Sequence, residues 1–301
     1  MTTPLRFIGE PLVLDKPVLI TMLSGWIDAS GAANNAVEAL KKATNARLVA
    51  TFNADTFIDY RARRPIMELR EGLNTRMRWA VPEIHAGTDA NGRDIVILCG
   101  PEPDTAWELF VETVCTFAAT HGVQRAFAIG AYPFATPHTR PPQLSCHSPS
   151  ADVLAEVPFL KNSADVPAGV SAVLEHGLTE RGIPALSLWA QVPHYVTALS
   201  YPAAAAALVS AVQMVADLVV DVSELVAEAL IQRERIDQLV SANPDHLEMV
   251  RQLERMFDQA ITDDAVKTEQ ADAGAQTPAN GDAIAAEVER FLREQLGRDN
   301  K

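Results

Sequence analysis

Continuous apolar runs alternate with helical patterns along the first two-thirds of the chain. The runs are rich in Val, Ile and Leu and lie at residues 17–23, 47–53, 94–100, 123–130 and 183–191. Helical patterns lie between them at residues 32–42, 105–120 and 168–181, the second with Asp104 as its expected N-cap. Strands of this kind are buried on both faces. The pattern therefore predicts an α/β fold, a mostly parallel sheet with helices on both faces.

The stretch from residue 57 to residue 82 interrupts this rhythm. Two short strand-like segments, 65–70 and 74–79, flank the turn Glu71-Gly72-Leu73. We therefore predict a β-hairpin that is inserted between two strands of the core.

Residues 196–216 contain no charged side chain over about the length that a bilayer requires. Pro202, several polar residues and a run of alanines weaken the hydrophobicity of this segment, and Asp217 follows it directly. The segment is better explained as a buried helix that completes the α/β core, which we assign to residues 1–220.

A helical extension follows the core. Apolar positions recur at spacings of three and four residues up to Leu239, and Asn243-Pro244-Asp245 then starts a second helix that includes Met256. This pattern predicts a helical hairpin over residues 221–260, with Leu239 and Met256 in its apolar seam.

The end of the chain has a different composition. Residues 262–282 are mainly Ala, Asp, Gln, Thr and Gly and lack apolar anchors, so we expect a flexible linker. A short terminal helix is expected at residues 283–296. Residues 261–301 are thus predicted to form a flexible acidic tail.

The net charge of the chain argues against some classes of binding partner. It has 39 acidic and 25 basic residues, a net charge of −14, and 18 of the acids but only 9 of the bases lie in residues 221–301. An acidic chain has no global electrostatic reason to bind nucleic acid or an anionic membrane. Neither is expected as a partner.

The spacing of the cysteines and histidines argues against a metal site. Cys99, Cys115 and Cys146 show no CxxC spacing, and the histidines are too scattered for a metal site. No G-x-G-x-x-G or P-loop pattern occurs, so neither a metal nor a cofactor is expected. The first ten residues lack the features of a secretory signal, and together with the cysteine usage this indicates a cytoplasmic protein.

Polar residues gather directly after the predicted strands, where ligands bind in open parallel sheets. Asp28, Glu102, His138 and His194 could serve there as general acids and bases, because carboxylates and imidazoles exchange protons near neutral pH. The alternative is structural, since loop carboxylates such as Asp28 often cap helices and loop histidines often make ordinary hydrogen bonds. Further candidate ligand- or partner-binding side chains in these loops are Trp26, Ser30, Tyr132, Arg140 and Tyr195.

Two local motifs suggest narrower chemistry. Residues 25–31 carry two glycines before a helix, so an anion could bind at that helix N-terminus, although Asp28 would repel it. Cys146 and His147 place a thiol beside an imidazole, but they lack the distant orienting group of a catalytic triad. The chain also has no G-x-S-x-G nucleophile motif.

The predicted hairpin is the one basic stretch of this acidic chain. Arg61, Arg63 and Arg64 precede it, and Arg70, Arg76 and Arg78 lie within it. Arginine binds carboxylates in a bidentate manner, so this patch could receive an acidic segment of another chain, including the acidic helices of a second copy. The equal alternative is internal salt bridging to Asp55, Asp59 and Glu68.

Five segments of the chain occur in a family-specific order. They are Gly25-Trp26-Ile27-Asp28-Ala29-Ser30-Gly31-Ala32-Ala33, Asp59-Tyr60-Arg61-Ala62-Arg63-Arg64-Pro65, Gly100-Pro101-Glu102-Pro103, Gly130-Ala131-Tyr132-Pro133 and Trp189-Ala190-Gln191-Val192-Pro193-His194-Tyr195. This set resembles the actinobacterial branch of the proteasome assembly chaperone 2 family. The resemblance implies a phosphorylase/hydrolase-like core with a helical C-terminal extension, and self-association as a trimer. Eukaryotic relatives act in pairs as chaperones for the proteasome α-ring, and the resemblance supplies no catalytic residue.

These observations favour a non-catalytic protein-interaction or assembly-chaperone-like module that associates with itself and with another protein. Missing nucleophile and metal signatures argue against an enzyme. One alternative is a phosphorylase/hydrolase-type enzyme that uses the four acid/base candidates. Another is a binding protein for a small polar or anionic metabolite at the strand carboxyl ends.

Overall fold

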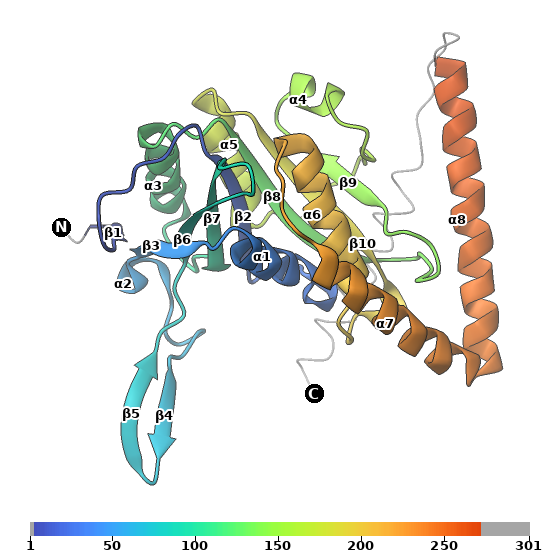
Figure 1. Cartoon of the computed structure of the whole chain (residues 1–301), viewed down its shortest axis with the longest axis horizontal. Coiled ribbons are helices and arrows are strands. Elements are labelled where there is room, and N and C mark those ends of the chain that lie inside the picture. The colour runs from blue at the N-terminus through green and yellow to red at the C-terminus, as the bar shows by residue number, and fades with distance from the viewer. Residues whose placement is uncertain (1–2, 272–301) are drawn as a thin grey trace.

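A central eight-stranded sheet organises the computed structural model in Figure 1, which describes residues 3–271. The strand order is β1-β3-β6-β7-β2-β8-β10-β9, and β4 and β5 form a separate two-stranded sheet. The strands are β1 Leu5–Phe7, β2 Val18–Ser24, β3 Arg47–Phe52, β4 Ile66–Arg70, β5 Leu73–Arg78, β6 Glu83–Thr88, β7 Asp94–Pro101, β8 Arg125–Phe134, β9 Leu144–His147 and β10 Ala185–Pro193. The helices are α1 Ala32–Ala43, α2 Ala54–Phe57, α3 Trp107–Thr120, α4 Ala151–Ala155, α5 Val170–Glu180, α6 Pro202–Ala216, α7 Ser223–Ser241 and α8 Pro244–Ala271.

The centre of this sheet is parallel and its flanks are antiparallel. β2 pairs in parallel with β7 and β8, and β8 pairs in parallel with β10. β1, β3 and β6 on one flank and β9 on the other pair antiparallel with their neighbours. The predicted α/β fold with helices on both faces is confirmed. The antiparallel flanks are an addition that the sequence pattern did not indicate.

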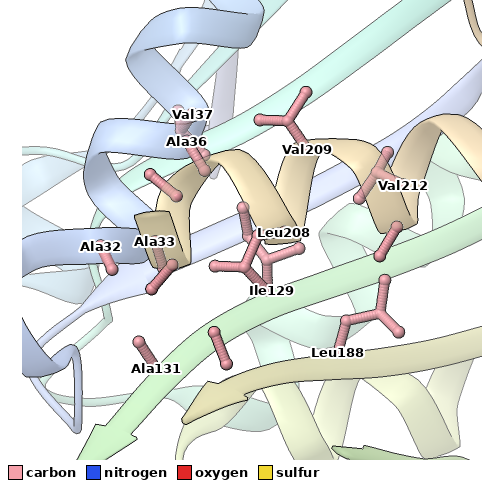
Figure 2. Packing of buried hydrophobic residues seen from close by; sticks show 14 of the residues in the cluster. Ala32, Ala33, Ala36, Val37, Ile129, Ala131, Leu188, Leu208, Val209 and Val212 are labelled. Atoms are coloured by element: carbon pink, nitrogen blue, oxygen red, sulfur yellow. The ribbon is translucent and has the colours of Figure 1, made fainter. Parts of the chain in front are cut away.

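Alternate residues of the central strands face opposite layers of helices. In β2, Val18 belongs to the apolar cluster that contains α1 and α6, whereas Leu19 belongs to the cluster that contains α3 and α5. Figure 2 shows the first layer, where Leu208 of α6 lies next to Ile129 of β8 and Ala36 lies on α1, which crosses α6. Small side chains on α1 let the two helices approach the sheet closely. Because Leu208 is fully buried, its truncation to Ala would cost about 2–5 kcal/mol.

α6 is the uncharged segment that imitates a membrane span. It begins with Pro202 in its first turn and ends at Asp217, whose backbone is left-handed with φ 53°. Leu208 and Val212 are fully buried between α1 and the sheet. In residues 3–271, no helix combines the length and the apolar character that crossing a bilayer requires. The prediction of a buried helix is confirmed.

The β4–β5 hairpin projects from the base of the sheet, away from both helix layers (Figure 1). Met67 lies opposite Met77 and Glu68 opposite Arg76, with a register shift between Glu68 and Leu69. Every residue of β5 is exposed. The predicted hairpin insertion is confirmed, and within the described chain its strands pair only with each other.

α7 and α8 follow the core as two consecutive helices, where the sequence pattern predicts a helical hairpin with an apolar seam. The buried apolar residues of the two helices are Leu225, Ile236, Val240, Val250 and Leu253, and the first four belong to the core cluster of α1, α6 and the sheet. Leu239 and Met256 are 61% and 54% exposed, so their assignment to the seam is wrong. Leu239 directly precedes Val240 and is therefore rotated by about 100° from the buried stripe.

α8 is longer than the sequence predicted. It runs on to Ala271, so the first part of the expected linker is helical instead. The segment lacks apolar anchors, but Ala, Glu, Lys and Gln favour helix without them, and a helix that is already nucleated extends at low cost. The predicted terminal helix at residues 283–296 lies outside the described residues.

Candidate functional site

Asp28 caps α1 and is not available as an acid or base. Its Oδ1 accepts a hydrogen bond from the Ala33 amide at 2.8 Å and its Oδ2 one from the Asn34 amide at 3.1 Å. Burial raises the pKa of Asp28, and these two hydrogen bonds offset part of that rise. The carboxylate occupies the helix N-terminus where an external anion was considered, so residues 25–31 do not offer an anion site.

Glu102 lies just after β7 and caps a different helix. Its Oε2 accepts a hydrogen bond from the Val170 amide, the first residue of α5, at 3.2 Å. An ideal Cβ on Gly25, whose φ is +133°, would lie 2.9 Å from Glu102 Cγ and 2.8 Å from Nη2 of Arg63. Gly25 therefore permits a close approach of the Glu102 and Arg63 side chains over its backbone.

His138 is buried and connects the loop after β8 to α7. The Tyr195 hydroxyl accepts from the His138 amide at 2.8 Å and donates to its Nδ1 at 2.6 Å, so the ring proton lies on Nε2. Nε2 donates to Asp237 on α7 at 3.0 Å. Burial lowers the pKa of His138, and Asp237 opposes that shift in part. Both ring nitrogens hold structure together, so His138 has no free position for catalysis.

His194 completes the set and is exposed, with its ring edge-on to Tyr195 at a centroid distance of 5.4 Å. Of the four acid/base candidates, only Glu102 lines the cavity at the carboxyl ends of the strands. The predicted grouping of Asp28, Glu102, His138 and His194 in one crevice is therefore wrong. Loops that follow neighbouring strands begin close together, but their side chains need not converge.

The other predicted binding residues have varied surroundings. Trp26 and Tyr132 line the cavity, whereas Ser30 donates to the Val196 carbonyl at 3.1 Å. Arg140 binds Glu254 and Asp258 of α8 at 3.3 and 2.8 Å, which fastens α8 to the loop after β8.

The arginine patch divides between internal pairing and exposure. Arg63 pairs with Asp104 at 2.9 Å, and Asp104 also accepts from the Asp59 amide, so its predicted role as N-cap of α3 is wrong. That helix begins at Trp107 instead. Arg70 and Arg78 pair with Glu68. Arg61, Arg64 and Arg76 are exposed and form no ion pair with the described residues.

A cavity of about 390 Å³ lies between α5 and the β8–β10–β9 part of the sheet. It is lined by Met22, Leu23, Trp26, Ile27, Glu102, Ala128, Ile129, Tyr132, Ser145, Cys146, His147, Asn162, Ala164, Val166, Pro167, Ala168, Gly169, Ser171, Ala172, Ser187 and Trp189. Strand register explains the floor of this cavity. Ser187 lies opposite both Ala128 and His147, and the next row on the same face joins Gly130, Trp189 and Ser145. The other face of these strands is uniformly apolar.

Trp189 is fixed by a hydrogen bond to His147 of the neighbouring strand, β9. Its Nε1–H donates to Nε2 of His147 at 3.1 Å, because an indole nitrogen can only donate. His147 therefore carries its proton on Nδ1, which faces Glu175 Oε2 at 3.0 Å. Gly130 provides space for the indole, since an ideal Cβ there would lie 2.4 Å from Cζ3 of Trp189.

Cys146 and His147 point to opposite faces of β9. Cys146 belongs to the apolar cluster under α6, and burial raises the pKa of its thiol. His147 lies on the cavity side. The adjacent thiol and imidazole therefore do not form a nucleophile and base, as the missing triad partner also indicated. No group of three potential metal ligands occurs in residues 3–271.

Sequence reasoning missed Ser145, His147, Ser187 and Trp189 as cavity residues. The available signal was period-two alternation, with polar or aromatic residues at 145, 147, 187, 189 and 191 between apolar ones. This alternation indicates a strand with one face that is not filled by apolar side chains. It was obscured by the overall apolar character of residues 183–191.

Comparison with known proteins agrees with this architecture. The profile of the PAC2 family matches residues 22–240, and no curated protein matches the chain significantly. Rv2714 of Mycobacterium tuberculosis is 31% identical, with a TM-score of 0.79 over 88% of this chain and 92% of that one. A PAC2 family protein of Streptomyces avermitilis is 30% identical, with a TM-score of 0.71 over 78% of this chain and 99% of that one. The M. tuberculosis proteasome-assembly chaperone homologue Rv2125 is 29% identical, with a TM-score of 0.72 over 77% and 99%. The chain belongs to the PAC2 family.

Proposed function

We propose that the protein is a non-catalytic, assembly-chaperone-like interaction module that binds a protein partner through its β4–β5 hairpin. The observation that carries this proposal is the exposure of the hairpin. Its exposed apolar side chains, 39–68% accessible, are Ile66, Met67, Leu69, Leu73, Met77 and, at its base, Trp79. A lone two-stranded hairpin is marginally stable in water, and clustered exposed apolar residues are typical of interaction surfaces. A partner that covers the hairpin would stabilise it and would bury its exposed apolar side chains.

The base of the hairpin offers a second contact area. Trp79 packs edge-on against Tyr60 at 4.9 Å and borders an open hollow of about 700 Å³ along β1 and β3. Arg6 and Phe7 also line this hollow, which has no acidic residue in its lining. Both the hollow and the hairpin therefore suit a partner that is acidic and partly apolar.

Family membership supports a role in protein assembly. Rv2125, which is similar over most of its length, is described as a homologue of a proteasome-assembly chaperone. Of the four acid/base candidates, Asp28, Glu102, His138 and His194, only Glu102 lines the cavity at the strand carboxyl ends. An assembly role requires surfaces rather than reacting groups, and the exposed hairpin supplies such a surface.

We propose a second copy of the chain as one such partner, bound through its α7–α8 hairpin. Residues 221–301 have 18 acids and 9 bases, which complements the six arginines between residues 61 and 78. α7 also exposes Val226, Leu230 and Ile231 beside Glu228 and Glu234. Contact between two different surfaces of the same chain is heterologous and closes into a ring, such as a trimer, when the rotation permits.

Charge reversal in the hairpin tests the proposal. The triple variant Arg61→Glu, Arg64→Glu, Arg76→Glu should lower the mass measured by light scattering to that of the monomer. Mixing it with a Glu228→Arg, Glu234→Arg variant should restore association, because the charges again complement each other.

Arg47→Glu is the matched control, since Arg47 is exposed on β3 and forms no ion pair within residues 3–271. It should leave the mass unchanged. An oligomer that survives the triple reversal, or a wild-type chain that is monomeric throughout the accessible concentration range, would contradict the self-association part. If the wild-type chain is monomeric, the interaction module is tested instead by whether it binds other proteins and whether the triple variant loses that binding.

A further inference from the structure

The lining of the 390 Å³ cavity has an unusual charge balance. Glu102 is its only carboxylate, and no lysine or arginine lines it. Glu175, which faces His147, is also buried, and its Oε1 has no hydrogen-bond partner. Arg63 approaches Glu102 over Gly25, but its guanidinium is paired with Asp104 and is not part of the lining. An anionic ligand would therefore meet the Glu102 carboxylate without a cation in the lining to bind it. The cavity is therefore suited to a neutral or cationic ligand.

Aromatic and small side chains define the shape of this space. Trp26, Tyr132 and Trp189 supply aromatic surface. The small side chains of Ala128 and Ser187 leave space above the sheet. Hydroxyl and amide groups of Ser145, Ser171 and Asn162 add scattered hydrogen-bonding positions. A volume of about 390 Å³ lies within the roughly 300–1,000 Å³ range of small-molecule sites, most of which are apolar with few polar groups.

The walls of the cavity are held in place before any ligand binds. Glu175 of α5, His147 of β9 and Trp189 of β10 form a continuous hydrogen-bonded row, and Gly130 leaves room for the indole. Glu102 is fixed by its hydrogen bond to the Val170 amide. A site whose side chains are already ordered loses less conformational entropy on binding.

We propose that this cavity binds a flat aromatic amine or another cationic or neutral heteroaromatic molecule. Its ring would contact the indole of Trp189, and its nitrogen would be bound by the Glu102 carboxylate. Cation–π attraction to the tryptophans favours the same charge as Glu102 does. The site lies on the sheet face beside α5 and does not depend on the hairpin contact proposed above.

Three probes with the same ring system and different charge test this proposal. They are 1-naphthylmethylamine, 1-naphthylmethanol and 1-naphthoate, titrated into the full-length protein by calorimetry. We expect saturable binding of the amine at least tenfold tighter than that of the carboxylate, with the alcohol between them. Glu102→Gln should remove the preference for the amine over the alcohol and retain binding of the alcohol.

Ser187→Leu fills the cavity floor and should abolish binding of all three probes. If this variant does not fold, Ser171→Leu at the less buried start of α5 serves the same purpose. Arg61→Glu changes only the segment before the β4–β5 hairpin and should bind the probes as the wild type does. Loss of probe binding and loss of the proposed hairpin contact can therefore be told apart. Absence of saturable binding, preference for the carboxylate, or binding that persists in the filled variants would overturn the proposal.

Discussion

The indole of Trp189 rests directly on the bare backbone of Gly130. A Cβ atom at residue 130 would lie 2.4 Å from Cζ3 and 2.5 Å from Cε3 of the ring. Gly130→Ala forces the indole or β8 to move, and overpacking of this kind costs about 1–3 kcal/mol. We expect urea denaturation to show this loss in the free energy of unfolding.

The same substitution in a chain that lacks the indole is its control. In a Trp189→Ala background, Gly130→Ala meets no ring and should change the free energy of unfolding by less than about 0.5 kcal/mol. Equal losses in the two backgrounds would show that the indole is not the cause.

Attachment of α7 to the core should depend on pH. Burial lowers the pKa of His138 below its ordinary value of 6.5, and Asp237, Arg233 and Glu254 are the charged groups around it. The unfolded chain then takes up the His138 proton at a higher pH than the folded chain does. The corresponding stability is present above about pH 6.5 and is lost as the pH falls from 6.5 through the folded-state pKa. Melting temperatures between pH 7.5 and 5 should show the decline.

His138→Gln separates this contribution from those of other groups. Gln does not titrate, so the variant should be less stable at pH 7.5 and should lose less stability on acidification than the wild type. Parallel pH profiles for the two proteins would assign the decline to other residues.

Arg140 should control the local stability of α8. Its guanidinium binds Asp258 and Glu254, and the pKa of Asp258 is held below its usual value by Arg140. Arg140→Ala should speed hydrogen exchange in α8 and leave exchange in β2 and β8 unchanged, and high salt should act similarly on the wild type. Arg251→Ala is the control, because Arg251 pairs with Glu248 within α8 itself. Faster exchange in both variants would indicate a general loss of helicity.

The cysteines should be unreactive in the native protein. Burial raises the pKa of Cys99 and of Cys115 to about 11 and raises that of Cys146 as well. Because the thiolate is the reactive form, Ellman's reagent at pH 8 should modify none of the three within minutes. All three should react in guanidinium chloride. Cys146 borders the cavity but is only 5% exposed. Rapid modification of Cys99 or Cys115 in the native chain would reveal an opening of the core that the structure does not show.

The sequence predicted most of the core because its strands are buried on both faces and carry unbroken apolar runs. β9 escaped detection, since it has four residues inside a proline-rich loop, and β6 did so because Glu83 and His85 interrupt its apolar pattern. Strand register cannot be obtained from one sequence. The rows that join Ser187 with His147, and Gly130 with Trp189, therefore became visible only in the structure.

Side-chain direction limited the prediction of the site in the same way. The sequence places His138 and His194 in loops after strands, but it does not show that Tyr195 and Asp237 occupy both ring nitrogens of His138. Asp28 is the counterexample, because capping depends on local spacing to Ala33 and was foreseen as the structural alternative. Local roles can thus be predicted from one sequence more readily than roles that depend on distant partners.

Both borders of the main sheet are protected against strand addition. β1 has only three residues, and the outer edge of β9 is occupied by Leu160, which exchanges backbone hydrogen bonds with Leu144 and Cys146. Such short or covered edges prevent sheets of separate molecules from joining. β4 and β5, by contrast, each have an outer edge of unpaired amides and carbonyls in the described chain. If another polypeptide joins this protein by main-chain hydrogen bonding, the place it can extend is the hairpin, with the eight-stranded sheet left intact.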